Sequence, residues 1–528
     1  MPLQSHAQWR PRVATCFVAT AVLVGVLAGC GSGKPGSAPS SASPSGPGGT
    51  VSITEDLGGT SSEPVTFDPT KSHVPMVQNP WDMAIYSTLL RPTPSGGYLP
   101  ELATSATIVD PRTIAVQLRP GVVFSDGTPV TALAVKQGIL RNRDSKASAF
   151  QAILQDVSGI DVTGDSAITI HLSAPVAGAF YPLLAGEESF IVSPAASSGD
   201  LNNHPVGAGP FVLQQYVPDQ KIVLARNPRY WDAKDIRISE LEYVNTAPGP
   251  QQVNALESNL ANVSQIPISD VPAVRSNSAY TVGTAAAQTQ SLWMPVCKST
   301  APLNLVPVRQ ALSYAIDRPA INAAVLKGVG EPQWALWPQG SIYFPAQLRN
   351  YYAYNPQKAQ QLLAQAGYPN GFPLSILISP SPVIEQAATI IQQEWKAIGV
   401  KATLVTSSNF VNDLYIRKVA PLGINPEVRG GVAVLTGPYQ PGSEGDLCNF
   451  DNHSLDAIAS QLSSLAPQNP KAIDLWRQAQ TYVVQNALSI WLEFSPYVFA
   501  SSKKVSGVQF LAQYALPVPY YWSLSVGG

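Results

Sequence analysis

Charged side chains are scarce in this chain of 528 residues. Lys, Arg, Asp and Glu together make up 12% of it, against roughly a quarter in an ordinary globular protein, and the formal net charge is only −2. No run of basic residues is present. The composition therefore excludes a protein that attracts nucleic acid by its charge, and we expect no nucleic-acid partner.

Catalytic and metal-binding motifs are also missing. Beyond the N-terminal segment the histidines are His73, His171, His204 and His453, none with a partner at metal-ligand spacing, and there is no HExxH, CxxC or GxSxG motif. The glycines of "PVGAGPF" at 205–211 lack the spacing of a dinucleotide-binding loop. We predict no metal, no cofactor and no enzymatic activity. A catalytic group assembled from distant segments is the alternative that such patterns leave open.

Cysteine is rare as well. Cys16 and Cys30 lie in or directly after the N-terminal apolar segment, which leaves Cys297 and Cys448 in the body of the chain. In an oxidising compartment such a pair predicts one disulfide. It would close a loop of about 150 residues and stabilise the fold by roughly 5 kcal/mol at most. Two separate buried thiols are the alternative.

The N-terminal segment has the order of a secretory signal. Two arginines precede an uncharged run over residues 13–27, which is shorter than the roughly 20 apolar residues of a membrane-spanning helix. Its end, Leu27-Ala28-Gly29-Cys30, resembles the lipobox of bacterial lipoproteins. The resemblance implies that residues 1–29 are a signal peptide and that the Cys30 thiol is acylated. An ordinary secretory signal followed by a chance cysteine is the alternative.

Residues 30–49 are almost wholly Gly, Ser, Pro and Ala. Such a stretch buries no apolar surface and predicts a flexible tether. We expect the mature chain, Cys30 to Gly528, to lie outside the cytoplasm and to be held to the cell membrane by the lipid on Cys30.

Local patterns indicate a mixed α/β fold. The stretch 113–118 alternates, with three aliphatic residues on one face, as a half-buried strand does, and Thr131 then stands where a helix cap is expected. Between residues 354 and 406 a helix capped by Asn355, a strand, a second helix and a second strand follow one another. This order and these lengths predict a βαβ crossover with parallel strands.

Several separated blocks resemble one protein family. "PELATSATIVDPRTIAVQLRPGVVFSDGTPVTALAV" (100–135) resembles the signature of the family 5 extracytoplasmic solute-binding proteins of ABC importers, which include oligopeptide-, dipeptide- and nickel-binding proteins. Further blocks that resemble this family follow in order: "PVGAGPFVLQQY" (205–216) with "RNPRYWD" (226–232), "VRQALSYAIDR" (308–318), "YNPQKAQQLLAQAGYPNGF" (354–372) and "LSIWLEFSPYVFASSKKVSGVQF" (488–510). The blocks are mostly turns, helix caps and core positions, so they identify a fold rather than a ligand.

The resemblance implies a periplasmic-binding-protein-like α/β fold, with two lobes joined by a two-strand hinge and an extra domain as in the large oligopeptide-binding proteins. Lobe I would take residues 50–80, 202–296 and 506–528, the extra domain 81–201, and lobe II 297–505. Cys297 and Cys448 then fall within one lobe, as a cysteine pair does in some oligopeptide-binding members. Ligand enclosed between the lobes would bias them toward a closed form, which a membrane permease recognises.

Peptide-binding members of the family carry an aspartate just after the cysteine of the second lobe, where it anchors the ammonium group of the peptide. Here Asn449 and Phe450 follow Cys448 instead. Three nearby acids are candidates to take the place of that aspartate: Glu444, Asp446 and Asp451. The competing interpretation of each is a solvated loop carboxylate.

Aromatic side chains and one arginine complete the predicted ligand site. By the resemblance, four aromatic residues lie in segments that border the cleft, where their rings supply apolar surface, and Phe450 is added to them. Arg429 would pair with a ligand carboxylate. Core packing is the alternative for each aromatic residue and an exposed position the alternative for Arg429. The four aromatic residues are Trp293, Trp334, Trp337 and Tyr439.

We therefore predict a lipid-anchored solute-binding protein that captures a small ligand, a short peptide or a peptide-like compound, and delivers it to an ABC permease. We expect it to act as a monomer. The alternative is a non-transport relative with an altered cleft that serves as a regulatory or scaffolding partner in the cell envelope. The missing acid after Cys448 keeps that alternative open.

Overall fold

The computed structural model describes residues 48–57, 65–71, 80–146, 148, 150–285, 290–428, 433–443, 445–448, 452–511 and 518–527. Cys30 and the predicted signal peptide lie outside the described residues, and so do Arg429, Glu444, Phe450 and Asp451. Residues 46–528 form one compact unit. Within the described ranges, none of the helices combines the length and the apolar character needed to cross a membrane.

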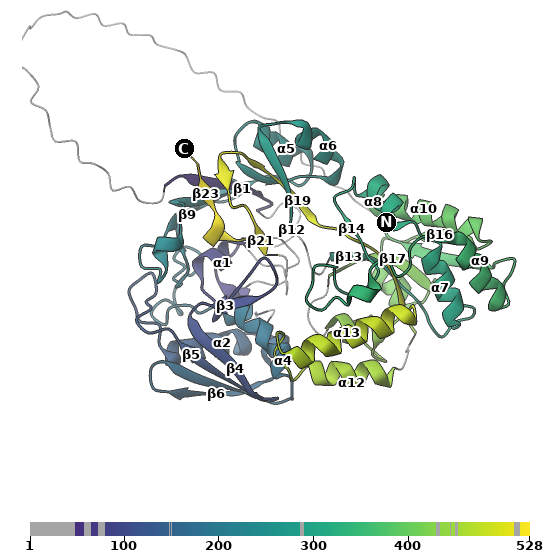
Figure 1. Cartoon of the computed structure of the whole chain (residues 1–528). Helices are drawn as coiled ribbons and strands as arrows, with labels where there is room; N and C mark the ends of the chain where they lie inside the picture. The colour runs from purple at the N-terminus through teal and green to yellow at the C-terminus, as the bar shows by residue number, and fades with distance from the viewer. Residues whose placement is uncertain are drawn as a thin grey trace, which may run out of the picture. The chain divides into compact units, whose positions relative to one another are not determined.

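A seven-stranded mixed sheet forms the first part of this unit. Its central strand β1 is parallel to both of its neighbours, β10 and β11, and the other pairs are antiparallel. The strands lie in the order β12 (Tyr280–Ala285), β19 (Tyr497–Ser502), β11 (Val263–Gln265), β1 (Thr50–Glu55), β10 (Glu240–Asn245), β9 (Lys221–Arg226) and β8 (Phe211–Val217). The helices that accompany it are α1 (Pro80–Ile85), α5 (Pro250–Glu257) and α6 (Val271–Ser276), as Figure 1 shows.

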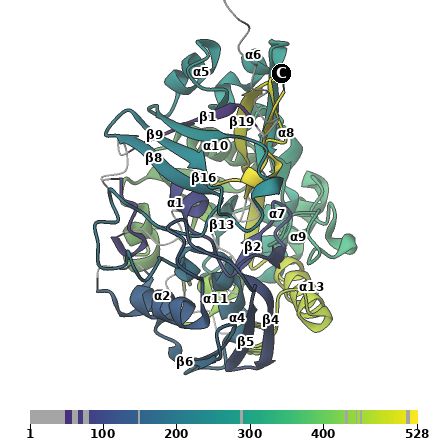
Figure 2. The same cartoon turned by 90° about the vertical axis from the view of Figure 1, so that its left-hand side faces the viewer.

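An antiparallel four-stranded sheet forms the second part, in the order β4 (Ala103–Asp110), β5 (Thr113–Leu118), β7 (Ala167–Leu172) and β6 (Val157–Thr163). The predicted alternation over 113–118 is confirmed, because Ile114, Val116 and Leu118 are buried. The side chain of Thr131 caps α2 (Ala132–Asp144), as predicted, by accepting a hydrogen bond from the Ala134 N–H. This helix shares one core with the sheet, and Figure 2 shows it beside the strands.

A six-stranded mixed sheet forms the third part. Its strands lie in the order β14 (Glu331–Pro332), β18 (Ser489–Phe494), β13 (Gln290–Pro295), β17 (Leu422–Val428), β15 (Pro373–Ile378) and β16 (Lys401–Thr406). The predicted βαβ crossover is confirmed, since β15 and β16 are parallel and α10 (Pro382–Ala397) connects them. Asn355 caps α9 (Pro356–Gln365), also as predicted.

Two sets of helices pack against opposite faces of the six-stranded sheet. Along β18, Ile490 and Leu492 belong to the core of α7 (Val306–Tyr314), α8 (Arg318–Val325), α9 and α10. Trp491, between them, belongs to the core of α11 (Ala433–Tyr439), α12 (His453–Leu462) and α13 (Pro470–Gln485). Because successive side chains of a strand point to opposite faces, β18 carries both cores.

The chain crosses between the seven-stranded and six-stranded sheets twice. It passes from β12 to β13 between Ala285 and Gln290, and from β18 to β19 through Ser495 and Pro496. The expected division counted Gln290–Pro295 with lobe I and Tyr497–Ser502 with lobe II, whereas strand pairing assigns these two segments the other way round. Paired strands share hydrogen bonds and a core, so we draw the division at the two crossings.

The remaining elements are short. The strands are β2 (Leu90–Pro92), β3 (Tyr98–Pro100), β20 (Val505–Ser506), β21 (Phe510–Leu511), β22 (Val518–Pro519) and β23 (Ser525–Val526). The single-turn helices are α3 (Gln151–Leu154), α4 (Ala177–Phe180), η1 (Pro69–Lys71), η2 (Tyr181–Ala185), η3 (Glu187–Ser189), η4 (Ala233–Asp235), η5 (Ile268–Asp270), η6 (Ala346–Leu348), η7 (Asn412–Ile416) and η8 (Tyr521–Ser523).

Candidate ligand-binding site

The blocks at 100–135 and 226–232 meet in a buried network around Glu101. Its carboxylate accepts hydrogen bonds from the Arg91 Nε at 2.6 Å, the Tyr230 hydroxyl at 2.6 Å and the Trp231 Nε1 at 3.0 Å. The Trp522 Nε1 donates in turn to the Tyr230 hydroxyl. The Ser87 hydroxyl donates to the Glu101 carboxylate at 3.3 Å. Every one of these partners is a donor, and they come from β2 and from the segments after α1 and before η4. This network therefore joins the four-stranded and seven-stranded parts and has a structural role.

The predicted aromatic residues lie inside the six-stranded part. Trp293 on β13 stacks against Trp491 on β18, with ring centroids 5.1 Å apart. Trp293, Trp337 and Tyr439 belong to one buried cluster, whereas Trp334 belongs to a neighbouring one. The structure thus brings three of the four aromatic candidates together. Their contact with a ligand stays a prediction.

Several buried polar groups in this part have no hydrogen-bond partner among the described residues. Among them are the indole Nε1 atoms of Trp334, Trp337 and Trp491 and both carboxyl oxygens of Glu493. Leaving a buried donor or acceptor unsatisfied costs about 1–3 kcal/mol, so such groups are rare unless a ligand or water meets them. Contact of these groups with a ligand stays a prediction.

Glu493 is fully buried, and burial raises the pKa of its carboxyl to about 9, against the opposing charge of Arg318. The Arg318 guanidinium is itself held by backbone carbonyls, with its Nε 2.7 Å from the Trp491 carbonyl oxygen. At neutral pH the Glu493 carboxyl therefore keeps its proton and can donate a hydrogen bond as well as accept one. Trp491 and Glu493 were not among the predicted site residues. The available signal was a single acid inside the apolar run "SIWLEF". Simple alternation does not place it, because the register against β13 shifts there and sets Glu493 opposite Leu292 but Trp491 opposite Trp293.

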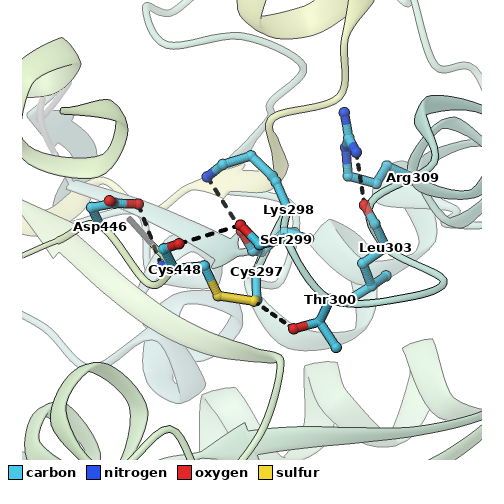
Figure 3. Close-up of a disulfide and its surroundings, with 9 residues drawn as sticks. Cys297, Lys298, Ser299, Thr300, Leu303, Arg309, Asp446 and Cys448 are labelled. Atoms are coloured by element: carbon cyan, nitrogen blue, oxygen red, sulfur yellow. Dashed lines mark hydrogen bonds between the residues drawn. A yellow bond between two sulfur atoms is a disulfide. The ribbon is translucent and has the colours of Figure 1, made fainter. Parts of the chain in front are cut away.

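The predicted disulfide is confirmed. Cys297 and Cys448 are bonded, with their Cα atoms 5.2 Å apart, and Figure 3 shows the bridge with its neighbours. The hydroxyl of Ser299 donates to the Cys448 carbonyl oxygen at 3.2 Å. The bridge fixes the segment 445–448 to the chain directly after β13.

Asp446 lies beside this disulfide and is only 6% exposed, so it is not a solvated loop carboxylate. Its Oδ1 accepts from the Cys448 N–H at 3.4 Å, and its Oδ2 has no partner within the described part of the chain. Lys298, which was not predicted, is also buried, and Figure 3 shows its ammonium group on the side of the bridge where Asp446 lies. Burial lowers the pKa of Lys298 to about 8, opposed by the charge of Asp446.

Tyr439 completes this corner of the six-stranded part. Its hydroxyl donates to the Ser489 Oγ at 3.0 Å, and the Lys298 Nζ lies 5.4 Å from the centre of its ring. Tyr439 and Asp446, both predicted from the sequence, are therefore linked through Lys298. Across the described residues, no group of three or more His, Cys, Asp or Glu side chains is placed to hold a metal ion.

Comparison with known proteins identifies relatives of the chain. A family model described as "Bacterial extracellular solute-binding proteins, family 5 Middle" matches residues 97–420. Heme-binding protein A of Haemophilus influenzae is 27% identical over 69% of this chain and 68% of that relative. Glutathione-binding protein GsiB of Escherichia coli is 27% identical over 57% of this chain. That match spans 59% of the relative, less than two thirds of its length.

Solved structures of the same fold cover most of the chain. The unliganded open form of the periplasmic murein tripeptide binding protein MppA has a TM-score of 0.80 at 20% identity, over 90% of this chain and 97% of the other. HbpA2 from Haemophilus parasuis has a TM-score of 0.78 at 22% identity, over 91% of this chain and 100% of the other. The predicted two-lobed periplasmic-binding-protein fold is thereby confirmed.

Proposed function

The chain belongs to the family 5 bacterial extracellular solute-binding proteins, and from this we propose that it captures a small ligand between two lobes and delivers it to an ABC importer. We take the seven-stranded part as lobe I, the four-stranded part as the extra domain and the six-stranded part as lobe II. We propose a short peptide or a peptide-like compound as the ligand. The role is binding and delivery, without chemical change of the ligand.

The observation that carries this proposal is the double crossing between two separately packed parts. The seven-stranded and six-stranded sheets have distinct hydrophobic cores, and the chain joins them at 285–290 and 494–497. Two parts that each bury their own core can rotate about such crossings without unfolding. Ligand that contacts both parts then biases the equilibrium between open and closed forms.

The buried polar groups of the six-stranded part support a peptide-like ligand. Three indole N–H donors and the protonated Glu493 carboxyl match the carbonyl acceptors of a peptide backbone. Among the relatives, one is named for glutathione and another for a murein tripeptide. We therefore rank peptides and peptide-like compounds before sugars and metal chelates.

We further propose that Cys30 carries the membrane anchor. The sequence Leu27-Ala28-Gly29-Cys30 and the tether after it support this location. The native protein is expected to partition into detergent, and a Cys30→Ala variant to appear in the aqueous phase. Equal partitioning of the two would refute the anchor and leave the proposed ligand capture untouched.

The test of ligand capture is thermal unfolding of the chain from residue 30 onward with Cys30→Ser. The probes are trialanine, reduced glutathione, a tripeptide from murein and haemin. A true ligand at a hundredfold excess over its Kd stabilises the fold by roughly 2.7 kcal/mol, seen as a rise in Tm. We expect at least one peptide probe to raise it. No rise with any probe would favour the non-transport relative.

A further inference from the structure

The lobes are also joined at a place distant from the crossings. The backbone N–H groups of Gly178 and Ala179, on α4 of the extra domain, both donate to the Ser463 carbonyl oxygen after α12 of lobe II, at 2.8 and 3.2 Å. The Ser464 hydroxyl donates back to the Pro175 carbonyl oxygen at 3.0 Å. Figure 1 shows α4 beside α12, away from the crossings at β12–β13 and β18–β19.

Gly178 makes this approach possible. A Cβ at this position would lie 2.2 Å from the Leu465 carbonyl oxygen, 2.5 Å from the Leu465 nitrogen and 2.7 Å from the Leu462 carbonyl oxygen. All three are backbone atoms, which cannot rotate away as a flexible side chain does. A glycine within a helix is less favourable than an alanine by about 1 kcal/mol. Its place in α4 is explained by the contact with lobe II and not by the helix itself.

A second contact lies nearby. Tyr98 of β3 packs against the extra domain, with its ring edge-on to Tyr181 at 5.9 Å. Burial raises the pKa of the Tyr98 phenol, and the neighbouring phenol of Tyr343 in lobe II raises it further. Tyr98 and Tyr343 are therefore close enough to interact across the same boundary.

We propose that the contact between residues 175–179 and 463–465 is a latch that holds the two lobes at a fixed angle. Rotation about the two crossings separates the extra domain from lobe II, because the extra domain is attached to lobe I through the Glu101 network. The latch must then break before the lobes can open further. The inference rests on the proposed function in one respect: if the lobes capture a ligand, the latch controls ligand entry and release.

Interlobe distances in the ligand-free protein test the latch. Spin labels are placed through Leu133→Cys on α2 and Ile416→Cys on η7, which are 53% and 73% exposed, in the chain from residue 30 onward with Cys30→Ser. Pulsed electron paramagnetic resonance then gives the distance distribution. We expect one narrow population in the parent protein and a broader, longer one after Gly178→Ala. Ser464→Ala, which removes one hydrogen bond, is expected to cause a smaller shift in the same direction.

The matched control is Gly159→Ala on β6 of the same domain, where a Cβ would meet no atom within 4 Å. It should leave the distribution unchanged. A Gly178→Ala distribution identical to that of the parent, or a parent distribution that is already broad, would overturn the latch. If Gly178→Ala does not fold, a Pro175→Cys and Ser464→Cys pair replaces it. That pair should form a disulfide in air and keep the distribution narrow, and failure to cross-link would count against the latch.

These outcomes are independent of the ligand. Absence of a thermal shift with every probe would refute the proposed function while the distance distributions still test the latch. Unchanged distributions would refute the latch while leaving ligand capture in place.

Discussion

Two buried glutamates in this protein differ in their surroundings. Glu101 is 1% exposed and Glu493 is 0% exposed. The carboxylate of Glu101 is met by an arginine, a tyrosine and a tryptophan, whereas that of Glu493 has no hydrogen-bond partner among the described residues. A satisfied buried network rigidifies a fold, and an unsatisfied group lowers stability unless something else meets it. The contrast separates a buried junction whose polar groups are satisfied from a buried acid whose polar groups are not.

The largest effect is expected from Glu101→Gln. This change removes the nearer carboxylate partner of the buried Arg91 guanidinium and leaves only Asp232 at 3.9 Å. Breaking a buried ion pair in this way costs about 3–5 kcal/mol. Denaturant unfolding of the variant and the parent measures the difference. The same substitution at Glu493 is the control and is expected to cause no loss of stability near neutral pH, because the folded chain already holds that carboxyl in its neutral form. Equal losses of stability from Glu101→Gln and Glu493→Gln would contradict the difference between the two glutamates.

The next largest effect is expected from reduction of the Cys297–Cys448 disulfide, which should lower the stability of the fold by about 2–4 kcal/mol. The effect should be confined to the six-stranded part, because Cys297 directly follows its strand β13 and Cys448 is held there by the bond. Amide hydrogen exchange is expected to rise over residues 445–448 and to stay unchanged around Glu101. Faster exchange at both places would show that the two regions are not independent.

Two tryptophan substitutions are expected to differ in their effect on stability, by a smaller amount. Trp231→Phe removes an indole N–H that donates to Glu101, and Trp491→Phe removes one that has no acceptor in the described structure. Each change also removes part of an aromatic ring. We expect Trp231→Phe to be more destabilising by about 1–3 kcal/mol in denaturant unfolding. A larger loss from Trp491→Phe would contradict the assignment of its N–H to a ligand.

Measured per pH unit, the smallest change is expected in the pH dependence of Glu493→Gln. Burial raises the pKa of Glu493 to about 9 in the folded chain from its ordinary value of 4.5 in the unfolded chain. Between these values the folded chain holds a proton that the unfolded chain has released, so the parent loses stability as the pH rises through that window. The slope is at most about 1.4 kcal/mol per pH unit. Denaturant unfolding at about pH 5, 7 and 9 is expected to show that the stability of the variant rises relative to that of the parent as the pH rises. Parallel curves of stability against pH would contradict the raised pKa.

Local patterns in the sequence predicted the elements that depend on near neighbours. The alternation at 113–118, the Asn355 cap and the parallel βαβ unit are confirmed because each is determined within a short stretch. The disulfide was also predictable, since few cysteines were available to pair.

Contacts between distant residues were not predictable in the same way. Glu101 and Tyr230 are 129 residues apart, and no local pattern couples them. The burial of Asp446 likewise depends on the disulfide and on Lys298, which follows a strand far away in the sequence. For the same reason Trp491 and Glu493 were missed, because a single acid in an apolar strand does not reveal whether its partners are present.

Native mass spectrometry of the protein purified from its own cells tests ligand capture most directly. The account predicts a population heavier than the bare chain by the mass of one small molecule, which denaturation releases and fragmentation identifies. A bare chain under native conditions, unaltered after incubation with the cell's own small-molecule extract, would contradict it.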